Sequence, residues 1–155
     1  MRALLLLLIA WQTTNPLAPF LPKPPQFINV STSTSATTVK PGSKLLLFVD
    51  VVPKPGIHVY APGAKDYMPI ALTVAAQPKV RLGKLVYPKS ETMTFENERI
   101  PVFQQPFRMI EEVTLGAVPV GTSLAIGGTI TYQACDDKVC YKPETVPVTW
   151  MVAVK

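Results

Sequence analysis

The sequence has little of the chemistry on which many protein functions depend. Its 155 residues include one histidine and two cysteines, and no basic run is interleaved with aromatic residues. A closed zinc site needs four ligands, which two thiolates and one distant histidine do not supply. A nucleic-acid surface needs clustered basic residues, whereas the formal charge of +5 comes from scattered lysines. We therefore expect no stable metal, no cofactor and no nucleic acid as a ligand.

Long apolar segments and helical periodicity are also missing. Residues 3–11 form an apolar run of nine, about half of the ~20 residues that a membrane-spanning helix needs. The 17 prolines and eight glycines, together with little apolar pattern of helical period, argue against a helix bundle.

The N-terminus predicts export from the cytoplasm. Arg2 followed by the apolar run matches the start of a secretory signal, and we expect residues 1–14 to form one, with a buried N-terminal strand as the alternative. Residues 15–26 contain five prolines and predict an extended linker. We then expect the folded domain to span residues 27–155.

What the sequence does contain is a series of short β-strands. Apolar and β-branched residues recur in runs broken by proline and glycine, which is typical of an all-β antiparallel sandwich. Alternation is clearest in residues 124–132 and 146–154, whose apolar side chains should face the core. Gly127-Gly128 predicts a bulge or bend. The apolar run Lys44–Val52 predicts a strand that is buried on both faces.

Residues 88–105 are the least strand-like part of the domain. Polar side chains surround the isolated aromatic residues Phe95 and Phe103. Long irregular loops on a compact scaffold often serve as lids or binding loops. A mobile hairpin connection fits this composition equally well.

The two cysteines, Cys135 and Cys140, have four residues between them and lie between two predicted strands. A disulfide between them would close a very small loop, and the stabilisation that a disulfide gives by chain entropy falls as its loop shortens. Thiol–disulfide exchange is therefore the first functional hypothesis, and export would provide an oxidising compartment. The residues alone leave two alternatives open. One is a passive disulfide that staples the turn, and the other is a copper site that adds His58 or a methionine.

The sequence around the cysteines resembles a known family. Residues 132–135, Tyr-Gln-Ala-Cys, followed by residues 140–145, Cys-Tyr-Lys-Pro-Glu-Thr, are similar to the redox-active segment of the N-terminal domain of the bacterial thiol:disulfide interchange protein DsbD family. Upstream, residues 56–60, Gly-Ile-His-Val-Tyr, resemble that family's Gly-aromatic-x-Tyr strand. The resemblance covers roughly residues 27–155.

The resemblance implies an immunoglobulin-like β-sandwich in the periplasm. Its cysteine pair would take reducing equivalents from a membrane-embedded thiol reductase and pass them to periplasmic thioredoxin-like proteins. Cys135 and Cys140 would be the exchanging pair, and Cys140 would form the mixed disulfide. His58, Tyr60 and Tyr132 would flank them. Because no multi-span membrane segment or Cys-x-x-Cys thioredoxin domain follows in the sequence, we expect the membrane donor to be a separate chain.

The family also covers its disulfide with a cap loop that carries an aromatic and acidic residues. Residues 88–105 take that place in chain order, and Phe95, Glu96 and Phe103 are the candidate cap residues. Two functional hypotheses follow. The first is a redox relay, and the second is an exported β-sandwich that binds another protein and has a purely structural disulfide.

Overall fold

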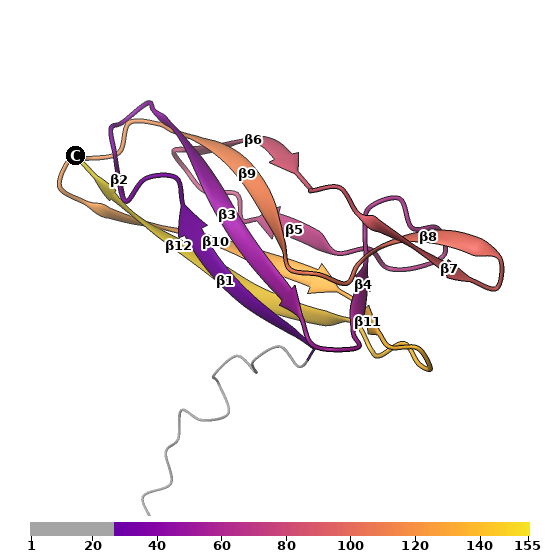
Figure 1. The fold of residues 1–155 in the computed structure, drawn as a ribbon. Helices are drawn as coiled ribbons and strands as arrows, with labels where there is room; N and C mark the ends of the chain where they lie inside the picture. The colour runs from indigo at the N-terminus through magenta and orange to yellow at the C-terminus, as the bar shows by residue number, and fades with distance from the viewer. Residues whose placement is uncertain (1–26) are drawn as a thin grey trace, which may run out of the picture.

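The computed structural model describes residues 27–155, so the predicted signal (1–14) and linker (15–26) lie outside the described residues. Twelve strands form this part of the chain (Figure 1): β1 (Ile28–Thr34), β2 (Thr38–Val39), β3 (Lys44–Pro53), β4 (His58–Tyr60), β5 (Ala71–Val74), β6 (Val80–Val86), β7 (Glu91–Phe95), β8 (Glu98–Phe103), β9 (Phe107–Leu115), β10 (Ser123–Tyr132), β11 (Ala134–Cys135) and β12 (Glu144–Val154). None of the described residues belongs to a helix that could span a bilayer.

The strands form two long sheets and one small sheet. The long sheets have the orders β1-β3-β9-β6 and β2-β12-β10-β5, and the small sheet has the order β11-β4-β8-β7. All pairs are antiparallel except β12 with β2. Figure 1 shows the long sheets stacked and the small sheet at the end of the molecule away from the C-terminus. The predicted all-β, immunoglobulin-like antiparallel sandwich is confirmed.

Strand β12 forms much of the core, as its alternation predicts. Its alternate residues Val146, Val148, Trp150, Val152 and Val154 are all buried, and the residues between them face outward. The side chain of Trp150 is 1% exposed, and its indole Nε1 donates a hydrogen bond of 2.9 Å to the carbonyl of Phe48 on β3. Because a buried indole N–H needs a partner, this bond fixes how the two long sheets face each other.

Strand β3 is buried on one face, and the prediction of burial on both faces was wrong. Leu45, Leu47, Val49 and Val51 are buried, whereas the residues between them are half-buried or exposed. The reason is that β3 lies in a sheet of antiparallel strands, which needs only one covered face.

The expected bulge at Gly127-Gly128 is also absent from β10. Its register with β12 runs without interruption from Ser123 to Tyr132. Gly128 instead permits a close approach, because a Cβ there would lie 2.8 Å from the Thr73 carbonyl oxygen and 3.2 Å from the Trp150 ring.

Residues 88–105 form a β-hairpin, not an irregular loop. Strands β7 and β8 are joined by Glu96 and Asn97, whose φ angles of 46° and 68° are those of a tight two-residue hairpin turn. The sequence left a hairpin connection open as one of two alternatives, because β7 is mostly exposed and its alternation is limited to Met93 and Phe95.

Candidate functional site

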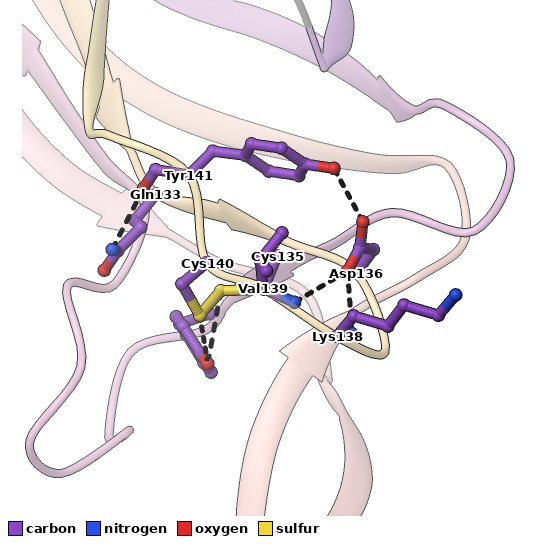
Figure 2. The surroundings of a disulfide bond; sticks show 8 residues. Gln133, Cys135, Asp136, Lys138, Val139, Cys140 and Tyr141 are labelled. Carbon is purple, nitrogen blue, oxygen red and sulfur yellow. Dashed lines mark hydrogen bonds between the residues drawn. A yellow bond between two sulfur atoms is a disulfide. The ribbon is translucent and has the colours of Figure 1, made fainter.

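The small sheet brings the two predicted cysteines to the end of the sandwich. Strand β11 pairs with β4 so that Cys135 lies opposite His58 and Ala134 lies opposite Val59. The chain then turns back, and Cys140 forms a β-bridge with Cys135. The two residues are joined by a disulfide, with their Cα atoms 4.1 Å apart (Figure 2).

Asp136 organises the turn between the cysteines. Its Oδ1 accepts hydrogen bonds from the backbone N–H groups of Lys138 (2.7 Å) and Val139 (2.8 Å), and its Oδ2 accepts one from the Tyr141 hydroxyl (2.6 Å) (Figure 2). The bond from Tyr141, followed by the two backbone bonds, lowers the pKa of Asp136 from 3.8 to about 2. The carboxylate is therefore the form that holds the turn.

Replacing Asp136 with asparagine should loosen this turn in a pH-dependent manner. Because its pKa is lower in the folded state, its contribution to stability is complete above pH 3.8 and is lost as the pH falls to about 2. We expect the melting temperature of wild type to exceed that of Asp136→Asn by an amount that is constant above pH 4 and shrinks below it. Thermal unfolding followed by circular dichroism measures this difference.

The matched control is Asp137→Asn, which removes the same charge from the exposed neighbouring position. The difference in melting temperature between wild type and Asp137→Asn should change little with pH. An equal loss in both variants would mean that general charge, not the hydrogen bonds of Asp136, stabilises the turn.

The two cysteine residues differ in their exposure to solvent. Cys135 is 1% exposed and belongs to the apolar cluster formed with Tyr60, Ile100 and Val102. Cys140 is exposed at the surface. An external thiolate can therefore approach Cys140 directly, whereas Cys135 is shielded by the small sheet.

Tyr60 on β4 contacts both sulfur atoms. Its hydroxyl oxygen lies 3.4 Å from the Sγ atoms of Cys135 and Cys140, and because disulfide sulfurs carry no proton the hydroxyl is the donor. The ring is 3% exposed and stacks on Tyr67 at 4.2 Å. Burial and, to a lesser extent, Tyr67 raise the pKa of Tyr60. The phenol thus keeps its proton at neutral pH and can stabilise negative charge on either sulfur.

His58 lies on the same strand, two residues before Tyr60, and is 4% exposed. Its ring meets the Tyr60 ring edge-on, with centroids 5.6 Å apart. Residues 27–155 contain one buried side-chain nitrogen or oxygen atom that has no hydrogen-bond partner, and this atom is Nε2 of His58. Burial lowers the pKa of His58, and the charges of Asp137 and Asp136 oppose this effect.

A cavity of about 370 Å³ opens beside the disulfide. One wall is the cysteine turn, another is β4 with His58 and Tyr60, and a third is the β7–β8 hairpin with Met93 and Phe95. Phe95 stands at the end of the hairpin and is 51% exposed, and Val139 on the turn is 52% exposed. The site thus combines a disulfide with an apolar rim.

The structure brings together some of the candidate residues and separates others. His58, Tyr60, Cys135, Cys140 and Phe95 line the cavity. Glu96 lies in the hairpin turn next to Phe95.

Two candidates lie away from the cavity. Phe103 is buried in the main core, where it stacks on Phe107 at 4.0 Å. Tyr132 is buried too, and its hydroxyl donates a hydrogen bond to Glu144. Burial, with this bond, raises the pKa of Tyr132.

Sequence reasoning missed Tyr67 and Met93, which also line the cavity. Tyr67 comes from the segment between β4 and β5, and Met93 from the hairpin strand β7. Neither lies in a motif, so no local signal marks them. Val139 could have been found, because it is an apolar residue between charged and polar neighbours.

Comparisons with known proteins identify the family and the fold. The model of the family described as thiol:disulfide interchange protein DsbD, N-terminal, matches residues 25–150. The sequence matches none of the curated proteins with which it was compared.

Two solved structures show the same fold. The DsbD N-terminal domain of Neisseria meningitidis in the reduced form has a TM-score of 0.50 and 18% identity, over 88% of this chain and 93% of that one. The N-terminal periplasmic domain of ScsB from Proteus mirabilis has a TM-score of 0.58 and 11% identity, over 85% of this chain and 49% of that one. With the family match over residues 25–150, the chain belongs to the family of DsbD N-terminal domains of thiol:disulfide interchange proteins.

Proposed function

We propose that the domain is a periplasmic relay for reducing equivalents that works through Cys135 and Cys140. A membrane-embedded thiol reductase would supply two electrons, and thioredoxin-like proteins would receive them. The observation that carries the proposal is the unequal exposure of one disulfide at an open cavity, with Cys140 exposed and Cys135 buried. A purely structural bridge needs neither the cavity nor an exposed cysteine residue.

The geometry supports a two-step exchange. A donor thiolate attacks Cys140 Sγ, the Cys135–Cys140 bond breaks, and Cys135 leaves as a thiolate. The second thiolate of the same donor then attacks the donor sulfur of the mixed disulfide, and Cys140 is released as a thiolate. The donor is oxidised to a disulfide, the domain gains two electrons, and the two released thiolates take up the two protons that the donor thiols lost when they ionised. The same steps in reverse reduce an acceptor disulfide.

Tyr60 and the cavity rim fit this reaction. The Tyr60 hydroxyl lies within 3.4 Å of both sulfurs, so it can donate a hydrogen bond to whichever sulfur carries negative charge. Phe95, Met93 and Val139 form an apolar rim on which a partner can exclude water from the reacting sulfurs.

The reduction potential of the disulfide tests this function. We expect a value between about −270 and −120 mV, the range of thioredoxin and the periplasmic oxidant DsbA. The domain is equilibrated with glutathione or dithiothreitol buffers of known potential, and thiols are counted by alkylation and mass spectrometry. A potential below about −300 mV is typical of structural disulfides, and would support the protein-binding hypothesis in place of the relay.

A further inference from the structure

We propose that His58 carries the proton that moves when the Cys135–Cys140 disulfide is opened. The inference rests on the proposed exchange function, and it assigns a chemical role to the single histidine of the sequence.

The backbone places the imidazole next to the shielded sulfur. His58 is the direct cross-strand partner of Cys135 in the β4–β11 pair, and side chains directly opposite in an antiparallel pair have Cβ atoms about 4.5–5.5 Å apart. His58 and Cys135 line the same cavity. Tyr60, two residues further along β4, shares this face and contacts both sulfurs. The imidazole thus lies in the cavity that both cysteines line, on the strand that pairs with the leaving cysteine.

The imidazole also has an unused hydrogen-bonding atom. Within the described residues, His58 Nε2 is buried and lacks a hydrogen-bond partner. An unsatisfied buried polar atom is unfavourable and is rare in folded proteins. A protonated Nε2 beside a newly formed Cys135 thiolate would gain an ionic hydrogen bond, so the orphaned atom fits a site prepared for the intermediate of the exchange.

The surrounding charges suit a group that gains and loses a proton. Asp136 and Asp137 on the cysteine turn favour the imidazolium, and burial disfavours it. Lys138 on the same turn, Tyr60 on β4 and Tyr67 also line the cavity. Tyr60 lies closer to the sulfurs, but its pKa is raised, so at neutral pH it donates a hydrogen bond and does not accept a proton. Of the three titratable aromatic rings that line the cavity, His58, Tyr60 and Tyr67, the imidazole is therefore the one with a nitrogen that can accept a proton.

The step balances as follows. A donor thiol gives its proton to neutral His58 and, as a thiolate, attacks Cys140 Sγ. The Cys135–Cys140 bond breaks, a bond between the donor sulfur and Cys140 forms, and the electron pair of the broken bond stays on Cys135. The imidazolium then gives its proton to the Cys135 thiolate, so the products are a mixed disulfide and a neutral Cys135 thiol.

Reduction by dithiothreitol tests the proposal without a biological partner. The rate constant is measured by stopped flow between pH 5 and 9 for wild type and for His58→Gln, which keeps a polar side chain but does not titrate. We expect His58→Gln to be slower at pH 7 by about 10-fold, below the usual effect of a positioned acid–base group because a small thiol also ionises in solution. Its rate should follow the ionisation of dithiothreitol alone, whereas wild type should show a further inflection due to the imidazole.

A second His58 variant shows whether a slower rate results from the loss of the imidazole or from misfolding of His58→Gln. His58→Tyr keeps an aromatic ring on β4, and it should lose the inflection in the same manner as His58→Gln. Tyr60→Phe is the control, because it should slow the reaction at all pH values and keep the inflection.

Identical pH profiles for wild type and both His58 variants would overturn the proposal. If the potential measured for wild type lies in the exchange range, that result would reject the role of His58 alone. A potential below about −300 mV would reject the relay itself.

Discussion

Cys135→Ala should turn the domain into a covalent trap for thioredoxin-like proteins, and turnover should fall to the uncatalysed background. The variant keeps the exposed thiol of Cys140 and loses the buried thiol that would resolve a mixed disulfide. The partner is a thioredoxin-like protein that keeps only its nucleophilic cysteine, activated as a mixed disulfide with a small thiol. Non-reducing electrophoresis and intact mass then measure the adduct.

Cys140→Ala is the matched control, since it leaves a single thiol of the same loop in the buried position. We expect little adduct from it, because a folded partner cannot reach a sulfur whose residue is 1% exposed. Adducts of equal yield from both variants would contradict the assignment of Cys140 as the attacked sulfur. The absence of adduct from either variant would contradict the relay.

Trp150→Ala should cost about 3–5 kcal/mol of unfolding free energy, the usual effect of truncating a buried aromatic residue. The Trp150 ring is 1% exposed in the core, and its indole bonds the Phe48 carbonyl of the opposite sheet. The variant therefore loses apolar contacts and the hydrogen bond that connects the sheets. Urea unfolding followed by circular dichroism gives the change from the transition midpoint and slope.

Two further variants separate these contributions. Trp150→Phe keeps most of the ring but leaves the Phe48 carbonyl without its donor, so it should cost about 1–3 kcal/mol. Met151→Ala, at a neighbouring position that is 60% exposed, should stay within about 0.5 kcal/mol of wild type. If Trp150→Ala costs as little as Met151→Ala, then Trp150 does not hold the sandwich together.

The fold and the cysteine pair could be predicted because their signals are local. Alternation along residues 146–154 identified the core face of β12, and the spacing of Cys135 and Cys140 suggested a small bridged turn. The position of His58 and Tyr60 beside the cysteines came from a family resemblance, because the pairing of β4 with β11 joins segments more than 70 residues apart.

Other features depend on packing that no local pattern records. Gly128 suggested a bulge, but the structure requires glycine there for another reason. The Trp150 ring and the Thr73 carbonyl approach this position so closely that they leave no room for a side chain. The hairpin of β7 and β8 remained one of two alternatives, because β7 is mostly exposed and the burial of Ile100, Val102 and Phe103 on β8 depends on distant parts of the chain. The unequal exposure of Cys135 and Cys140 is also tertiary, since two identical residues in one short loop carry no mark of which one the small sheet covers.

The turn between the cysteines is held by bonds that do not involve sulfur. Asp136 accepts three hydrogen bonds, its own N–H donates to the Val139 carbonyl, and the Tyr141 N–H donates to Ala134. These bonds can persist when the disulfide is open, so the two thiols would stay close together. The effective concentration of Cys135 at a mixed disulfide on Cys140 is then high. The lifetime of each covalent complex would be short, so one domain could serve many partner molecules in succession.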